Sequence, residues 1–335
     1  NYKKSKSNQT ADTLIGVFSS TAVALGVFAA TFNGVTVVSN SAFALTTWFA
    51  VTFRENGLYV EKFRKFMNAE EKIKDGTLET KLEKPETIRL ENVSFTYPGN
   101  TEPTLKNITL EIKPYQKIAL VGYNGAGKTT LTNLLLRLYD VTDGAITVGG
   151  KDIREWKIKA YHENYAAVFQ DFSLFGATIG ENVAMNDSPD SERVLKALEE
   201  SSFTKKLPEG TDTVLLREFD EDGLSLSGGE GQKVAVARAF YKDCPFAILD
   251  EPSANLDPVS EYSLNEAMSR AARDKTVIFI SHRLSTTVMA DVIYMLENGE
   301  IVESGSHEEL MAKNGKYAYM FRLQAEKYKE NEIVK

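Results

Sequence analysis

Residues 122–130 read Gly-Tyr-Asn-Gly-Ala-Gly-Lys-Thr-Thr and fit the pattern G-x-x-x-x-G-K-[ST] of a phosphate-binding loop. An apolar run at residues 118–121 precedes this stretch, and a leucine-rich run at residues 131–138 follows it. The pattern predicts a buried strand, a glycine-rich loop and a helix whose N-terminus favours an anion. The loop residues expected to surround phosphate groups are Gly122, Asn124, Gly125, Ala126, Gly127 and Thr130.

The last part of the loop carries the side chains expected to act on the phosphates. Lys128 would reach the terminal phosphates, and the Thr129 hydroxyl would take a magnesium position. The alternative is a glycine turn that only joins a strand to a helix. The Lys-Thr pair favours a nucleotide site instead.

Composition limits the class of protein. The 335 residues have a net charge of −8 and a pI near 5.2, so a nucleic-acid partner is not expected, because phosphate backbones select basic surfaces. The single cysteine, Cys244, excludes an intramolecular disulfide and fits a reducing compartment. Because the chain begins with Asn1 and has no signal-peptide layout, we interpret it as a fragment that lacks its natural N-terminal part.

Residues 13–53 contain no charged side chain. A single helix of that length would be about 60 Å long, about twice the hydrocarbon thickness of a bilayer. A turn signal, Asn33-Gly34, lies near the middle, and basic residues flank both ends, which favours a hairpin with both ends in the cytoplasm. The alternatives are an amphipathic soluble helix pair and one very long helix. We therefore assign residues 1–70 to the last transmembrane helices of a membrane domain.

The rest of the chain changes in character. Residues 71–86 are rich in Lys and Glu and are interpreted as a linker, and residues 87–335 as a separate domain. Residues 88–97 and 105–112 alternate apolar and polar side chains, as half-buried strands do. Later apolar strands, among them those at residues 246–249 and 276–280, are separated by helical segments, which indicates an α/β domain with a mainly parallel sheet. The predicted helices lie near residues 191–200, 228–241 and 259–272.

Two acids follow the apolar run 246–249. Asp250 and Glu251 would lie at the carboxyl edge of the parallel sheet, beside the phosphate loop. Asp250 is expected to help hold magnesium, and Glu251 to polarise the attacking water.

A second anion cradle is predicted at Ser227, Gly228, Gly229 and Glu230, where the helix near residues 228–241 begins. Ser-Gly-Gly at a helix start offers backbone N–H groups and a hydroxyl to an anion. Two phosphate-binding edges in one domain predict two copies that close head-to-tail around shared nucleotides.

The order of these motifs along the chain resembles that of the ATP-binding cassette (ABC) family. The resemblance is to the transporter form of the family, in which membrane helices are fused ahead of the ATPase. The resemblance covers nearly the whole chain. It implies a P-loop NTPase fold of the ABC ATPase type, in which a mostly parallel sheet is joined by an antiparallel β subdomain and a helical subdomain, preceded by all-α transmembrane helices. It also implies ATP and Mg²⁺ as cofactors, and catalytic roles for Lys128, Glu251 and His282.

The resemblance assigns further roles. Tyr97 corresponds to the aromatic residue that stacks on adenine, and Gln170 to the glutamine that approaches magnesium and couples to the membrane domain. Ser227 to Glu230 correspond to the signature loop that caps the partner's ATP, and residues 254–257 to the dimer-interface loop. His282 corresponds to the switch histidine that contacts the γ-phosphate.

Two positions depart from the family pattern. Glu230 stands where the family usually has Gln, which puts an extra carboxylate near the partner's nucleotide and could retune hydrolysis. Asn255 stands where a small residue is frequent. Glu251 and His282 are both present, so a working half-site is expected.

The function expected from the sequence is an ATP-hydrolysing half of an ABC exporter. The exporter would be a homodimer or heterodimer in the cell membrane, with multiple spans, contacts to membrane lipid and the ATPase domain in the cytoplasm. The transported substrate cannot be read from the sequence. The alternatives are a soluble ABC-type ATPase of DNA repair or translation, and a nucleotide-gated scaffold.

Overall fold

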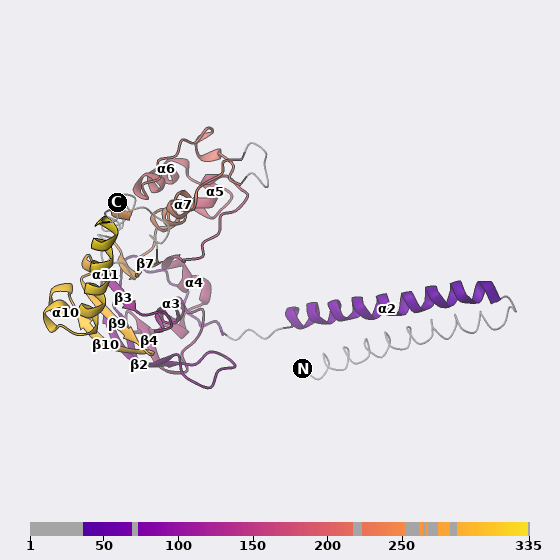
Figure 1. Cartoon of the computed structure of the whole chain (residues 1–335), viewed down its shortest axis with the longest axis horizontal. Coiled ribbons are helices and arrows are strands. Elements are labelled where there is room, and N and C mark those ends of the chain that lie inside the picture. The colour runs from indigo at the N-terminus through magenta and orange to yellow at the C-terminus, as the bar shows by residue number, and fades with distance from the viewer. Residues whose placement is uncertain are drawn as a thin grey trace. The chain divides into compact units, whose positions relative to one another are not determined.

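The structure, a computed structural model, describes residues 36–68, 73–216, 223–251, 261–263, 266, 274–281 and 287–333. The chain divides into two compact units, Asn1–Lys72 and Ile73–Lys335. Figure 1 shows the path of the chain through both units.

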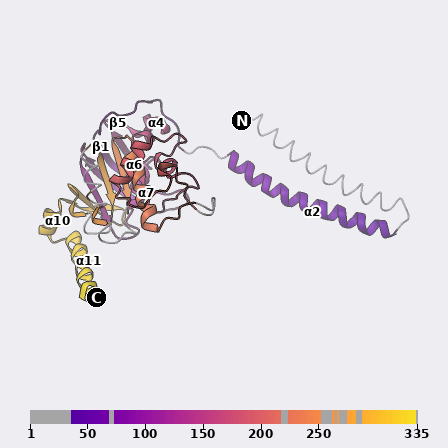
Figure 2. The same ribbon diagram turned by 90° about the horizontal axis from the view of Figure 1, so that it is seen from above.

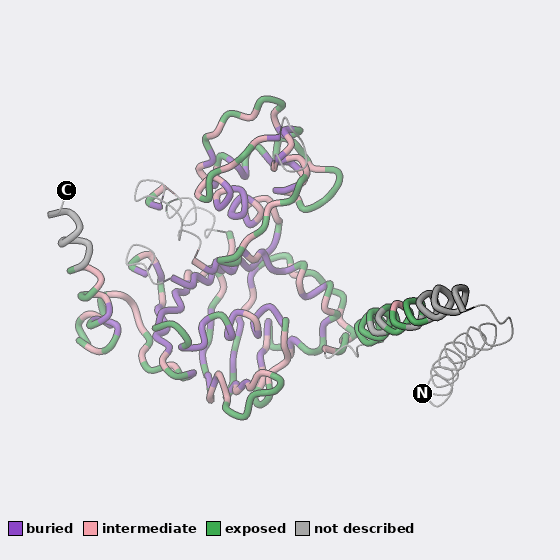
Figure 3. The backbone as a smooth tube through the Cα atoms, turned by 45° about the vertical axis from the view of Figure 1, so that its right-hand side comes forward, coloured by how far each residue is buried: buried purple, intermediate pink, exposed green. Residues whose placement is uncertain are grey.

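In the first unit, the described element is the 32-residue helix α2, Thr36–Met67. It runs without a break from the uncharged stretch 13–53 into the charged residues that follow. Its described side chains are mostly exposed, among them Trp48, Phe53 and Phe66 (Figure 3). Among the described residues, no helix has the length and apolar character needed to span a membrane. The part of the predicted hairpin before residue 36 lies outside the described residues.

The second unit contains two sheets. A four-stranded antiparallel sheet has the order β2-β1-β4-β5, and a six-stranded sheet has the order β10-β9-β3-β8-β7-β6. Strands β9, β3, β8, β7 and β6 of the larger sheet run parallel, and β10 pairs with β9 as a hairpin. The strands of the smaller sheet are β1 Ile88–Phe95, β2 Leu105–Ile112, β4 Asp143–Val148 and β5 Lys151–Asp152. Those of the larger sheet are β3 Lys117–Gly122, β6 Tyr165–Val168, β7 Phe246–Asp250, β8 Thr276–Ile280, β9 Val292–Glu297 and β10 Glu300–Gly305.

The helices form separate groups around these sheets. Helices α5, α6 and α7 gather at one end of the unit, and α10 and α11 lie away from them (Figures 1 and 2). The described helices of this unit are α3 Lys128–Leu135, α4 Ile158–Glu163, α5 Ile179–Ala184, α6 Ser191–Glu200, α7 Gly228–Tyr241, α10 His307–Lys313 and α11 Lys316–Ile333, with short 3-10 turns at Ile153–Glu155 and Gly210–Asp212.

Burial explains why the central strands are apolar throughout. Every residue of β7 and β8 is buried, since layers cover both faces of a parallel sheet. The largest core cluster packs the antiparallel sheet, α3 and one face of the larger sheet together. A separate core joins α5, α6 and α7, which makes the helical group a subdomain. The predicted mainly parallel sheet, antiparallel subdomain and helical subdomain are thus confirmed.

Part of the segment interpreted as a linker makes defined contacts with the rest of the second unit. The backbone N–H groups of Gly76 and Thr77 donate to the carbonyls of Trp156 and Glu155, at 3.0 and 2.7 Å. The Leu82 N–H donates to Asn164 Oδ1 at 2.7 Å. Residues 73–82 therefore lie along the domain surface rather than free in solvent, because the backbone groups pair with partners distant in sequence.

Candidate functional site

The loop between β3 and α3 has the backbone that its glycines allow. Gly122 and Gly127 have φ angles of 151° and 104°, where residues with a side chain are strained. A Cβ on Gly122 would lie 2.3 Å from the Leu296 carbonyl oxygen, and one on Gly127 would lie 2.6 Å from Leu105 Cδ2. The loop therefore curls against β9 and β2 in a conformation that only glycine permits.

A cavity of about 290 Å³ lies beside this loop. It is at the carboxyl ends of β3, β7 and β8, the edge at which open α/β sheets bind ligands. The lining residues are Thr104, Asn124, Gly125, Gly127, Lys128, Thr129, Thr130, Gln170, Asp250, Glu251 and Ile280. The tertiary structure thus brings the phosphate loop, Gln170 and the acid pair to one place.

Lys128 is buried and bound by its own loop. Its Nζ donates to the carbonyls of Gly122 and Tyr123, at 2.8 and 3.1 Å. Burial lowers the pKa of Lys128, and the charges of Glu251 and Asp250 oppose that shift. No side chain caps the N-terminus of α3, and no acid stands in its first turn. A cation and an uncapped helix start therefore face the same cavity, an arrangement that suits an anion.

The acid pair provides the opposite charge. Burial and the neighbouring charge of Glu251 raise the pKa of Asp250 to about 6, against a hydrogen bond from Thr129 and the charge of Lys128. A carboxyl group that is costly to ionise in this way favours a cation beside it.

These residues fit a magnesium ion. Asp250, Thr129 and Gln170 line the same cavity and carry the oxygen ligands that Mg²⁺ prefers. Among the described residues, no group of three His, Cys, Asp or Glu side chains could hold a metal ion. The donor set thus suits an ion that keeps waters and shares a phosphate, as Mg²⁺ commonly does.

Glu251 has an unusual backbone. Its φ is 47°, in the left-handed region, which costs a residue with a side chain about 1–3 kcal/mol. Two hydrogen bonds hold the residue there. Its N–H donates to the Ile280 carbonyl at 2.9 Å, and its carbonyl accepts from Gln232 Nε2 at 3.1 Å. The tertiary structure thus fixes the backbone of Glu251 beside the cavity.

The loop that opens α7 differs from the phosphate loop. Ser227 Oγ accepts from the Glu230 N–H, and Glu230 Oε2 accepts from the Ser227 N–H at 2.8 Å, which forms a capping box. Lys205 Nζ lies 2.8 Å from Glu230 Oε2. The hydrogen bond from Lys205, followed by that from the Ser227 backbone, lowers the pKa of Glu230. The extra carboxylate expected near the partner's nucleotide is therefore already paired within the chain.

Ser227 to Glu230 do not line the cavity of the phosphate loop. Ser227 and Gly228 are exposed. The two predicted anion cradles of one chain are therefore separate sites.

Tyr97 packs next to the phosphate loop without lining the cavity. Its hydroxyl lies 3.1 Å from Thr130 Oγ1, and its ring packs edge-on against Phe95 and Tyr139. Its predicted contact with adenine stays a prediction. His282 and residues 254–257 lie outside the described residues, so their predicted roles stay predictions too.

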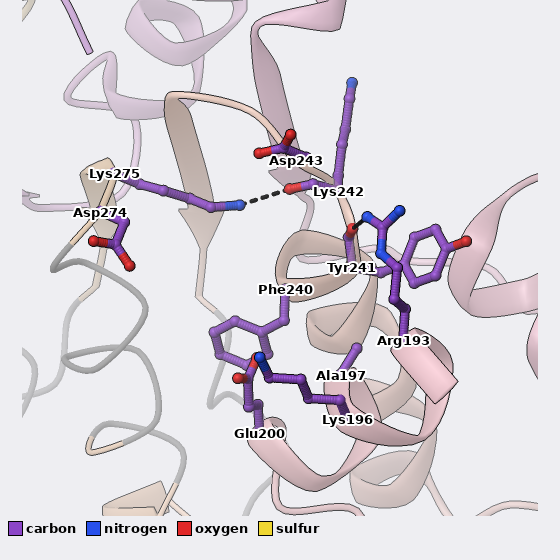
Figure 4. Close-up of a pocket in the computed structure, with 10 residues that line it drawn as sticks. All are labelled: Arg193, Lys196, Ala197, Glu200, Phe240, Tyr241, Lys242, Asp243, Asp274 and Lys275. Atoms are coloured by element: carbon purple, nitrogen blue, oxygen red, sulfur yellow. Dashed lines mark hydrogen bonds between the residues drawn. The ribbon is translucent and has the colours of Figure 1, made fainter. Parts of the chain in front are cut away.

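A larger hollow of about 570 Å³ lies between α6, the end of α7 and the segments before β7 and β8 (Figure 4). Two of the cations that line it donate to backbone carbonyls within the hollow. Lys275 Nζ donates to the Lys242 carbonyl at 2.6 Å, and Arg193 donates to the Tyr241 carbonyl at 2.8 Å (Figure 4). It also lies at the amino ends of the strands. The smaller cavity is therefore the better nucleotide site.

Three residues at or near the predicted sites could not be identified from any pattern in the sequence. Thr104, just before β2, and Ile280, the last residue of β8, line the cavity. Lys205 pairs with Glu230, 25 positions further along the chain. Gln232 lies just after the Ser227–Glu230 motif. Only its hydrogen bond to the Glu251 carbonyl, which forms in the folded chain, distinguishes it from an ordinary residue on one face of a helix.

Comparison with known proteins agrees with this geometry. Residues 105–254 match the ABC transporter family. The chain is 41% identical over 242 residues to the ATP-dependent lipid A-core flippase of Vibrio parahaemolyticus serotype O3:K6 (strain RIMD 2210633), a match that covers 71% of this chain and 41% of that protein. It is 35% identical over 339 residues to the flippase of the same name from Sodalis glossinidius (strain morsitans), which covers 95% of this chain and 57% of that protein.

A solved structure is also similar. A bacterial Atm1-family ABC exporter with ATP bound superposes with a TM-score of 0.72 at 29% sequence identity, over 95% of this chain and 57% of that chain. The chain thus spans about half the length of the relatives that it matches. The segment that matches the family model runs from the start of β2 to just beyond β7, and it includes the phosphate loop and the loop at the start of α7. This chain therefore carries the ATPase domain of the ABC transporter family.

Proposed function

We propose that the chain is the ATP-hydrolysing half of an ABC exporter. One observation carries the proposal: Lys128, the uncapped start of α3 and the Asp250–Glu251 pair face a single cavity. A polyanion with an associated divalent cation meets both charges of this site. ATP is the nucleotide that the family relatives use, as the name of the flippases states.

The proposed hydrolysis depends on positioning and electrostatics. Backbone N–H groups of the loop and Lys128 would bind the phosphate oxygens and absorb charge that develops on the transferred phosphoryl group. Glu251 would orient the attacking water. Thr129, Asp250 and Gln170 would hold magnesium, which supplies charge neutralisation on the phosphates. His282 would contact the γ-phosphate, and Tyr97 the adenine.

A second copy or a related half would complete each site. Ser227, Gly228 and Gly229 lie outside the cavity of their own chain, so they would bind the nucleotide held by a partner's phosphate loop. Homodimer and heterodimer both satisfy this arrangement. ATP would shift the equilibrium towards the closed dimer because it binds that state better.

The proposed reaction drives export across a membrane, with the ATPase domain on the cytoplasmic side. Support comes from relatives that match 95% of this chain, so that the similarity includes the segment before residue 73. A soluble ABC ATPase of DNA repair or translation would not be similar to exporters over that segment. The flippases among the relatives support a lipid as the transported substrate.

The test is magnesium-dependent phosphate release from ATP by the full chain, purified in detergent and reconstituted in lipid nanodiscs. We expect release that Glu251→Gln strongly lowers while ATP still binds. Release by the wild type no greater than that of Glu251→Gln would contradict the proposed hydrolysis and favour a nucleotide-gated scaffold.

A further inference from the structure

Gln232 lies on the first turns of α7, five positions after Ser227, and its side chain is 2% exposed. Its Nε2 donates to the backbone carbonyl of Glu251 at 3.1 Å. A buried amide that pairs with a backbone carbonyl 19 positions away fixes two segments against each other, because leaving either group unpaired is costly.

The carbonyl that Gln232 holds belongs to a strained residue. The φ of Glu251 is 47°, and the residue directly follows β7, all of whose residues are buried. With the N–H bond to Ile280, the bond from Gln232 fixes the peptide groups on both sides of the Glu251 Cα. Left-handed backbone persists at a residue with a side chain where its surroundings hold it. These two bonds therefore help to fix the direction in which the Glu251 side chain leaves the backbone towards the cavity.

We propose that Gln232 is a positioning residue for the hydrolytic reaction: it holds Glu251 in its left-handed conformation and links it to the loop at the start of α7. This inference rests on the proposed function, since it takes Glu251 as the group that orients water. Ser227 and Gln232 both lie at the start of α7. A displacement of the loop at Ser227 would therefore be transmitted through Gln232 to Glu251 of the same chain. The binding of a partner's nucleotide at Ser227 would thus adjust the chain's own catalytic glutamate.

The test replaces Gln232 by a side chain of similar shape without the donor, Gln232→Met. We expect kcat for ATP hydrolysis to fall on the order of tenfold to a hundredfold, as a catalytic group displaced by about 1 Å does. KM and the dissociation constant for ATP should stay at the wild-type values. Wild-type kcat in Gln232→Met would overturn the proposal.

A matched control separates positioning from stability. Asn164 is 1% exposed, and its Nδ2 donates to the Ala160 carbonyl at 2.9 Å, outside the cavity. Asn164→Leu should lower the unfolding temperature as Gln232→Met does, but should keep the wild-type kcat at temperatures where the protein is folded. An equal loss of kcat in both variants would assign the effect to general destabilisation and overturn the proposal.

A double variant identifies the route of the effect. If Gln232 acts through Glu251, adding Gln232→Met to Glu251→Gln should cause no further loss of the residual turnover. Losses that multiply would contradict the proposal. Should Gln232→Met fail to fold, Gln232→Asn keeps the polarity but is one methylene shorter, and it should show the same fall in kcat.

A structural readout is independent of activity. A crystal structure of Gln232→Met without nucleotide should show Glu251 outside the left-handed region, and an unchanged φ near 47° would overturn the proposal. Absence of phosphate release by the wild type would instead contradict the proposed function, and the crystal structure would still decide the role of Gln232.

Discussion

Two helix starts in this domain look alike in sequence and differ in structure. Glycines lie at the start of both α3 and α7, but the N-cap of α3 is Gly127, with no side-chain cap and no acid in the first turn. Helix α7 begins at Ser227 inside a capping box with Glu230, which is paired with Lys205. The start of α3 faces a cavity with a buried lysine, whereas the loop of α7 is exposed. We propose that the first holds an anion alone and that the second adds to an anion that another molecule holds.

The largest effect is expected at the cavity. Glu251→Gln should lower the rate of ATP hydrolysis on the order of 10²–10⁴-fold, because the amide cannot accept a proton from the attacking water. ATP binding should persist, and the closed dimer should accumulate, as measured by size-exclusion chromatography with ATP. Turnover at the wild-type rate would remove Glu251 from its role.

Lys128→Ala tests the cation that faces the phosphates. Loss of a charged hydrogen-bond donor is worth about 1.5–3 kcal/mol, so the dissociation constant for ATP should rise on the order of tenfold to a hundredfold. Titration with a fluorescent ATP analogue measures it. Lys151→Ala, which removes an exposed lysine, is the control and should bind ATP as the wild type does. Equal affinity in Lys128→Ala and the wild type would contradict the phosphate-loop assignment.

Ser227→Ala tests the second helix start. It should lower the unfolding temperature, since loss of a capping side chain costs about 0.5–2 kcal/mol. It should also weaken ATP-driven dimerisation while ATP affinity of the monomer stays the same. Ser306 forms the same kind of capping box with Glu309 at the start of α10, so Ser306→Ala is the matched control. It should lose stability without any change in dimerisation. If both variants dimerise normally, the two helix starts do not differ in the way proposed.

The smallest effect is expected at Glu230. The pKa of the Glu230 carboxyl is lowered in the folded protein. The ionised carboxylate therefore contributes its full stabilisation at pH values above the ordinary pKa of glutamate, about 4.3. It is lost as the pH falls through the lowered pKa of the folded state. Glu230→Gln should therefore unfold at a lower temperature than the wild type at pH 7, and the difference should shrink below about pH 4. Thermal unfolding followed by circular dichroism measures it. A difference that grows as the pH falls would contradict the Lys205–Glu230 pairing.

The regular elements were predictable because local pattern decides them. The helices at residues 191–200 and 228–241 and the strand at 276–280 agree with the structure. The short helices α4 and α5 were not predicted, because six residues give too little periodicity. Of the helix predicted at residues 259–272, positions 261–263 and 266 are described and are helical.

By itself, the sequence determined the chemistry available at the site: a glycine loop with Lys128 and Thr129, a buried strand that ends in Asp250 and Glu251, and a serine at the start of α7. These are local patterns, and each depends on a few adjacent residues. Only the tertiary structure decided that Gln232 holds the carbonyl of Glu251, that Lys205 neutralises Glu230, and that residues 73–82 lie along the domain. Each of these contacts joins residues far apart in the chain, and it forms because folding leaves a buried or charged group that must find a partner.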